Sequence, residues 1–88
     1  MANIRNLKKD INYVLGDIIE AVYIWESINS DKDRKASEAI IDEAIATFDD
    51  LIEKVNAKNI DNHKAHFKAI TTELETKSKA MIKKINAL

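Results

Sequence analysis

No proline occurs among the 88 residues of this chain, and glycine occurs once, at position 16. Soluble domains usually contain roughly 5% proline and 7% glycine, so both turn-forming residues are scarce here. A sheet protein of this length would need several tight turns, and tight turns rely on the special backbone angles of Gly and Pro. The sequence therefore predicts a chain that is helical over most of its length.

Composition and charge exclude several classes of function. The chain has no Cys, which excludes disulfides, thiolate metal sites and cysteine nucleophiles. Its residues are 45% hydrophobic and 33% charged, too apolar for a disordered chain and too charged for a membrane span. The formal net charge of -1 provides no strong field toward nucleic acid or anionic lipid. No apolar signal stretch opens the sequence, so we expect a cytoplasmic protein.

The first segment, residues 4–28, has an apolar residue every three or four positions, which is the spacing of one face of an α-helix. Asn3 is the expected N-cap of this helix, because its side chain can accept a hydrogen bond from a first-turn amide. Leu15 and Val22 widen the stripe. Its main line consists of Ile4, Leu7, Ile11, Val14, Ile18, Ala21, Trp25 and Ile28.

Two further helices are expected at about 33–58 and 62–87, after polar turns at 29–33 and 56–61. Ser30 or Asp33 would cap the second helix, and Asn59 or Asp61 the third. The second helix has one apolar face, made by Ile40, Ile41, Ala44, Phe48, Leu51, Ile52 and Val55. The apolar line of the third helix is interrupted, because it passes through Lys77 and Ser78 where an apolar residue would be expected. Its apolar residues are Phe67, Ile70, Leu74, Met81, Ile85 and Leu88.

These segments predict one all-α domain over residues 1–88, an antiparallel up-down-up three-helix bundle. Each helix is about 25 residues, or ~38 Å, long. Short connections between long helices favour antiparallel neighbours. A helical hairpin with a separate third helix would leave one apolar stripe in water, whereas the bundle buries all three stripes.

The charges are segregated between the second and third helices. Lys54 is the single base of residues 36–56, against the acids Glu38, Asp42, Glu43, Asp49, Asp50 and Glu53. From residue 62 onward Glu73 and Glu75 oppose the bases Lys64, Lys68, Lys77, Lys79, Lys83 and Lys84. Complementary flanks of adjacent helices would produce this pattern. Alternatively, the acidic face binds a basic partner or cations, or the lysine face binds a polyanion. Nucleic acid is not expected, because the third helix has no Arg and its aromatic Phe67 faces the core.

His63 and His66 are the only histidines, and their spacing of three can place two imidazoles on one helical face. A metal site would need a further ligand, for which Asp61 precedes them. Neither His follows a Glu by three residues, as carboxylate-bundle metal sites require. The other interpretation is a pair of half-exposed histidines beside Phe67, and we expect no cofactor.

Nothing in the sequence indicates an enzyme. The acidic pairs Asp42-Glu43 and Asp49-Asp50 lie opposite the apolar face, so solvent should surround them, whereas acid–base catalysis needs burial or crowding in a pocket. One Gly cannot form a phosphate-binding loop. Ser27, Ser30, Ser37 and Ser78 lack the context of a catalytic nucleophile.

A flank of the first helix is the strongest candidate for a functional surface. Mid-helix Gly costs up to ~1 kcal/mol relative to Ala, which close approach by another element would compensate. Aromatic residues outside the core line are typical of protein–protein contacts. The predicted surface for a partner helix or a homodimer consists of Tyr13, Gly16, Ile19, Tyr23 and Ile24. Gly16, Ile19 and Tyr23 should lie along one flank, with Tyr13 and Ile24 farther round the back of the helix. Alternatively, these residues cover the gaps between helices.

Residues 6–14, NLKKDINYV, resemble the opening of a family of small bacterial all-helical proteins, a domain of unknown function. The resemblance is clearest over the first helix and extends loosely, in length and helix spacing, over the rest of the chain. It implies a compact bacterial helical domain, and it brings no functional residues with it. The sequence thus favours a structural or protein-interaction module over a metal- or small-ligand-binding bundle at His63 and His66, or a polyanion binder.

Overall fold

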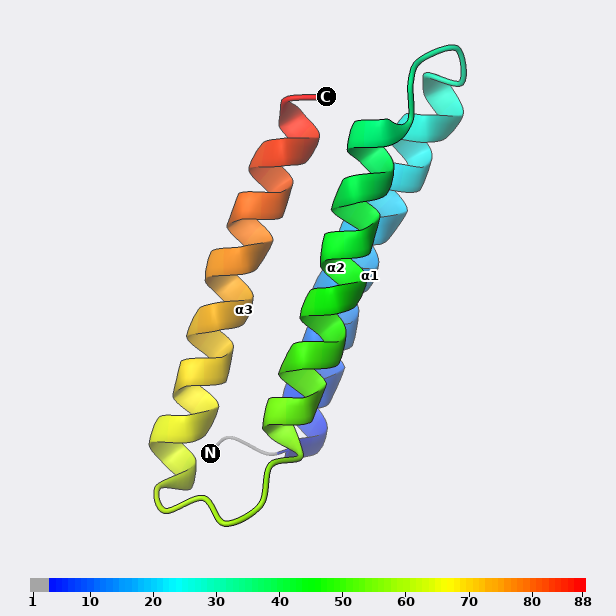
Figure 1. The fold of residues 1–88 in the computed structure, drawn as a ribbon. Coiled ribbons are helices and arrows are strands. Elements are labelled where there is room, and N and C mark those ends of the chain that lie inside the picture. The colour runs from blue at the N-terminus through cyan, green and yellow to red at the C-terminus, as the bar shows by residue number, and fades with distance from the viewer. Residues whose placement is uncertain (1–3) are drawn as a thin grey trace.

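The computed structural model describes residues 4–88 and confirms the all-α, antiparallel up-down-up three-helix bundle. Its helices are α1 (Ile4–Ile28), α2 (Lys35–Val55) and α3 (His63–Asn86). They alternate in direction along one slender molecule (Figure 1), whose Cα extents are 51 × 17 × 16 Å. Each helix contacts both others. The second and third helices are slightly shorter than the ranges 33–58 and 62–87, and Asn3 lies outside the described residues.

The buried line of α1 differs from the expected one. The expected residues follow a spacing of 3.5 per turn, which drifts by about 20° per heptad around a straight helix of 3.6. Ile28 is therefore 75% exposed, Ala21 is exposed, and Val14 and Trp25 are half-buried. Ile4 points to the buried side but lies in the first turn, and it is 45% exposed. The buried positions instead advance mostly in steps of four: Leu7, Ile11, Leu15, Ile18, Val22 and Glu26.

At the expected interruption of the apolar line of α3, Ser78 occupies the buried position and Lys77 is exposed. The Ser78 hydroxyl donates a hydrogen bond to the Leu74 carbonyl at 2.5 Å, so its burial leaves no unsatisfied donor. The remaining buried residues of α3 are Phe67, Ile70, Leu74 and Met81. Facing them and α1, the buried residues of α2 are Ser37, Ile40, Ile41, Ala44, Thr47, Leu51 and Val55.

The helix caps were only partly predicted. The N-cap of α2 is Arg34, which makes no side-chain cap hydrogen bond, rather than Ser30 or Asp33. Asp33, two residues before the start of α2, still accepts a hydrogen bond from the Lys35 amide at 2.9 Å. The cap of α3 is Asn62, whose Oδ1 accepts from the Ala65 amide at 3.0 Å; it is neither Asn59 nor Asp61. Asn59 adopts φ 62°, a left-handed conformation that Asn tolerates, and so forms part of the turn.

A buried polar pair joins α1 and α2 near their connecting turn. Glu26 occupies the last buried position of α1 and is 8% exposed. The Ser37 hydroxyl, which is fully buried, lies 2.6 Å from Glu26 Oε2 and 2.9 Å from the Arg34 carbonyl oxygen. The one proton of this hydroxyl can therefore be donated to either of two acceptors, the Glu26 carboxylate of α1 or the Arg34 carbonyl oxygen just before α2.

Candidate functional site

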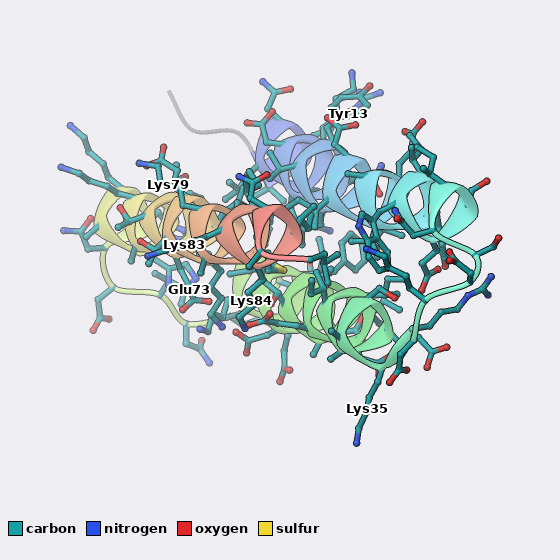
Figure 2. All side chains as sticks on the ribbon, turned by 90° about the horizontal axis from the view of Figure 1, so that it is seen from above. Tyr13, Lys35, Glu73, Lys79, Lys83 and Lys84 are labelled. Atoms are coloured by element: carbon teal, nitrogen blue, oxygen red, sulfur yellow. The ribbon has the colours of Figure 1, made fainter. Side chains whose placement is uncertain are left out.

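The structure distributes the five residues of the predicted partner surface around α1. Gly16 and Ile19 line a groove between α1 and α2, whereas Tyr13 lines a groove between α1 and α3. Figure 2 shows Tyr13 projecting outward from α1. Tyr23 follows Ile19 by four positions and so continues the same ridge. Ile24 is about 100° further round the helix. Tyr13, Tyr23 and Ile24 are all more than half exposed.

The groove between α1 and α2 is apolar, and we call it the open groove. It encloses about 220 Å³ and is lined by Asn12, Leu15, Gly16, Ile19, Ile45 and Phe48. Ile45 is 48% exposed, and Ile19 and Phe48 are half-buried against the core. Side chains of two helices thus present apolar surface to solvent along one line.

Gly16 has no packing role within the bundle. A Cβ added to Gly16 would meet no atom within 4 Å outside the adjacent residues and the backbone of its own helix. The close approach expected at this glycine is therefore not made by α2 or α3. Gly in the middle of a helix costs up to ~1 kcal/mol relative to Ala, and no side-chain contact among the described residues offsets this cost.

Acidic residues flank the open groove and form what we call the acidic border. Asp42 and Asp49 stand three residues before and four residues after Ile45, and Glu38 stands seven before it, so all three share its ridge of α2. Glu20 follows Gly16 by four positions on α1. All four are exposed. They take part in none of the ion pairs seen among residues 4–88.

The groove between α2 and α3, in contrast, is crossed by two ion pairs, and we call it the bridged groove. Lys54 Nζ lies 2.8 Å from Glu73 Oε1, and Lys84 Nζ lies 2.9 Å from Glu43 Oε2. Figure 2 shows Glu73 and Lys84 between the two helices. Only the Lys84–Glu43 pair follows the overall charge segregation, because Lys54–Glu73 joins the minority charge of each helix. Complementary flanks therefore account for only part of the segregation.

Lys54 also pairs with Asp50 within α2, at 3.1 Å. The hydrogen bond from Lys54 lowers the pKa of the Asp50 carboxyl from its ordinary value of 3.8. The carboxylates of Glu73 and then of Asp50 raise the pKa of the Lys54 ammonium above its ordinary value of 10.5. These groups are partly exposed, so solvent screens their interaction.

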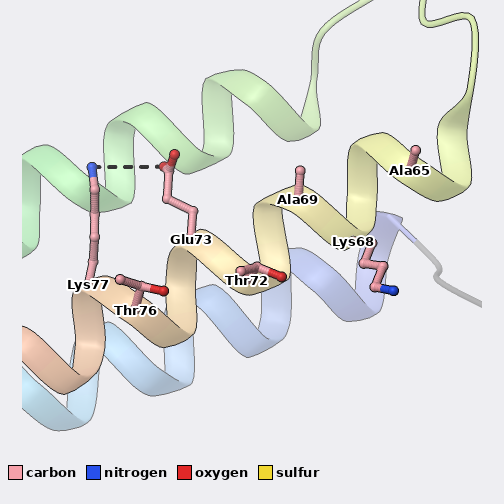
Figure 3. A pocket seen from close by; sticks show the side chains of 7 residues that line it. All are labelled: Ala65, Lys68, Ala69, Thr72, Glu73, Thr76 and Lys77. Atoms are coloured by element: carbon pink, nitrogen blue, oxygen red, sulfur yellow. Dashed lines mark ion pairs between the residues drawn. The ribbon is translucent and has the colours of Figure 1, made fainter.

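The outer face of α3 carries small residues and free lysines. Figure 3 shows Ala65, Ala69, Thr72 and Thr76 following one another along this single helix, beside the Lys77–Glu73 ion pair of 3.8 Å. They line a shallow hollow of about 560 Å³. The carboxylate that lines it, Glu73, is held in ion pairs with Lys77 and Lys54. The lysines of α3 that take part in no ion pair among residues 4–88 are Lys64, Lys68, Lys79 and Lys83.

His66 has a structural contact rather than a metal-like environment. Its Nε2 lies 2.7 Å from the Lys54 carbonyl oxygen in the last turn of α2, an oxygen that also accepts a hydrogen bond from the Ala57 amide at 3.2 Å. The rings of His63 and His66 lie 5.9 and 5.6 Å from the Phe67 ring. Across residues 4–88, no three side chains of His, Cys, Asp or Glu come together as a metal site.

The residue of the open groove that sequence reasoning missed is Ile45. A signal was present, because Ile45 is an isoleucine off the apolar line with an Asp three residues before it and another four after it. Periodicity within one helix shows only that such a residue is unusual. The groove also depends on how α1 and α2 are rotated relative to each other.

None of α1, α2 and α3 combines the length and apolar character that a membrane-spanning helix requires. The resemblance of residues 6–14 to small bacterial helical proteins stays a prediction. Comparison of the chain with protein-family models, curated proteins and solved structures gave no match.

Proposed function

We propose that this protein is a non-enzymatic protein-interaction module whose contact surface is the open groove, extended by Tyr23. The observation that carries the proposal is Gly16, a mid-helix glycine with empty space above it and apolar neighbours on both sides. A glycine lets a partner approach the helix backbone closely. The binding free energy of the partner would then offset the lower helix stability that glycine causes.

The surroundings of Gly16 support this function. Tyr23 is 56% exposed and Ile45 48% exposed, and a partner lying along the groove would remove both from water. Tyrosine is enriched in the protein contacts that contribute most binding energy. Tyr13 and Ile24, on other sides of α1, are not part of this surface, which narrows the predicted set to Gly16, Ile19 and Tyr23.

The environments of the acidic pairs also favour a binding role over catalysis. Glu43 pairs with Lys84 and Asp50 with Lys54, at 40% and 44% side-chain exposure, while Asp42 and Asp49 are exposed. Carboxylates in such open positions lack the enclosure that tunes a catalytic acid or base. A cytoplasmic location and a bacterial origin stay predictions from the sequence.

Site-specific photo-crosslinking in the native cell tests the contact surface. A photoreactive phenylalanine analogue at position 45 should form a covalent adduct with a protein, and the same analogue at exposed Thr72 of α3 should not. Gly16→Leu, which fills the groove, should abolish the adduct at position 45. An adduct that forms equally from both positions, or that persists in Gly16→Leu, would contradict the proposal, as would the absence of any adduct at 45.

A further inference from the structure

We infer that the partner of the open groove is a basic amphipathic helix, with apolar side chains for the groove and lysines or arginines for the acidic border. This inference rests on the proposed function and specifies its partner. It is carried by the apolar lining of the groove together with the unpaired charges beside it.

Beside Gly16 and Ile45 the charges that border the groove are all negative, while Lys8 and Lys9, four and three residues before Asn12, stand at one end of the groove. Glu38, Asp42 and Asp49 follow the α2 ridge and Glu20 stands on α1, with no ion-pair partner among residues 4–88. From residue 10 to residue 28, α1 contains no Lys or Arg. An acidic partner would therefore meet repulsion here, whereas a basic one would gain charge complementarity and faster association.

The geometry of the groove fits a helix. Two long antiparallel helices form its walls, so its course is nearly straight, and an amphipathic helix can place side chains at i, i+3, i+4 and i+7 along such a groove. Its enclosed volume of about 220 Å³ is below the range of about 300–1,000 Å³ usual for small-molecule pockets. A side chain of the partner helix would lie over Gly16, between Ile19 and Ile45.

The bundle already contains an example of this mode of binding. On its other side, the α1–α2 hairpin packs against α3, a helix with a buried apolar line and an excess of lysines. There Lys84 bridges to Glu43 of α2. A basic partner helix in the open groove would repeat the arrangement on the opposite flank of α2, with Asp42 and Asp49 in the role that Glu43 has toward α3.

A second copy of this chain is the weaker candidate for the groove. Two copies that docked symmetrically through it would use the same patch on both sides. The acidic borders of both copies would then lie near one contact. The basic helix of a second copy, α3, has its apolar line buried within its own bundle. Neither arrangement offers both the apolar stripe and the positive charge.

Binding of designed peptides to the full chain tests the inference. The probes are fluorescent helical peptides of about 18 residues, long enough for ~27 Å of helix. One carries a leucine stripe flanked by lysines, a second the same stripe flanked by glutamates, and a third the composition of the first with its leucines dispersed. Fluorescence anisotropy should show the lysine-flanked stripe binding at least about tenfold more tightly than either other peptide.

Two variants locate the binding, each with a matched control. Gly16→Leu should weaken the lysine-flanked peptide at least about tenfold, whereas Thr72→Leu on α3 should not. The pair Asp42→Lys and Asp49→Lys leaves the four border positions with two acids and two bases, so it should abolish the preference for the lysine-flanked over the glutamate-flanked peptide. The pair Asp17→Lys and Glu75→Lys, an equal change in net charge away from the groove, should leave the preference unchanged. Circular dichroism verifies that each variant is folded.

The possible failures are distinguishable. Equal binding of the dispersed peptide, or binding that Gly16→Leu leaves intact, would overturn the inference and remove support for the groove as contact surface. Tight binding of the glutamate-flanked stripe that Gly16→Leu abolishes would overturn the basic partner and retain the groove. Self-association in sedimentation that Gly16→Leu abolishes would identify a second copy as the occupant, with the same consequence.

Discussion

The two grooves beside α2 differ in whether their charged side chains have partners within the described chain. The bridged groove is crossed by Lys54–Glu73 and Lys84–Glu43, so its charges meet partners within the chain. The open groove has apolar walls, an empty position over Gly16 and an acidic border without ion pairs among the described residues. On the side of α3, the charged residues of α2 meet partners within the chain. On the side of the open groove, α2 presents apolar and acidic residues that no described residue covers or pairs with.

The largest expected change in the free energy of unfolding comes from the core of α2, and it can be compared with the change at the open groove. Leu51 is fully buried, and Leu51→Ala should lower the free energy of unfolding by about 2–5 kcal/mol. Ile45→Ala removes a side chain that is 48% exposed and should cost about 1 kcal/mol or less. Urea unfolding followed by circular dichroism measures both. Equal losses would mean that Ile45 is packed as tightly as the core, and that the groove is not open.

A second prediction concerns the buried pair at the hairpin end of the α1–α2 contact. Ser37→Ala leaves the buried Glu26 carboxylate without its hydroxyl donor and should cost about 1–3 kcal/mol. Glu26→Leu should cost less or stabilise the fold, because the Ser37 hydroxyl still reaches the Arg34 carbonyl. Urea unfolding of the two variants ranks them. A larger loss in Glu26→Leu than in Ser37→Ala would refute this ordering.

Gly16→Ala should raise the free energy of unfolding by up to ~1 kcal/mol, because the new methyl group meets nothing and Ala favours the helix. The matched reverse change is Ala46→Gly, at an exposed position in the middle of α2, which should lower it by a similar amount. Thermal and urea unfolding measure both. A loss of stability in Gly16→Ala would show that the fold itself requires this glycine.

The smallest effect expected is a pH dependence in the bridged groove. The lowered pKa of Asp50 means that its stabilising contribution is present above the ordinary value of 3.8 and is lost as the pH falls through the lowered pKa. Asp50→Asn should therefore be slightly less stable than the parent near neutral pH and should approach it in acid. Urea unfolding across this range tests the change, with Asp49→Asn as the unpaired control. A difference that is constant with pH would exclude the ion pair as its cause.

The fold class followed from the sequence because periodicity and the lack of Pro act locally. The position of the buried line in α1 could not be predicted in the same way. Ile28 and Ala21 fit a seven-residue repeat, but in a straight helix such a repeat rotates gradually away from the buried side. Glu26 was missed for a different reason. Its burial depends on Ser37, which lies across the turn in the next helix, and apolar patterns contain no information about such polar pairs.

The candidate site was predictable on α1 and unpredictable on α2. Gly16, Ile19 and Tyr23 are unusual for their positions in one helix, so they could be recognised from the first segment. Ile45 and the acidic border become part of the same surface only through the rotation of α2 against α1. Tyr13 was assigned to that surface because it is aromatic and outside the core line, but it lines the groove toward α3.

The slender shape, 17 × 16 Å across, leaves room at each level for little more than one core side chain from each helix. The core is therefore a narrow file of buried side chains along the length of the three helices. Within one such fold the free energy of local opening differs between the fraying ends and the core. A helix bound over Gly16 would slow amide hydrogen exchange mainly in the middle of the rod, while both ends continued to open at their own rates.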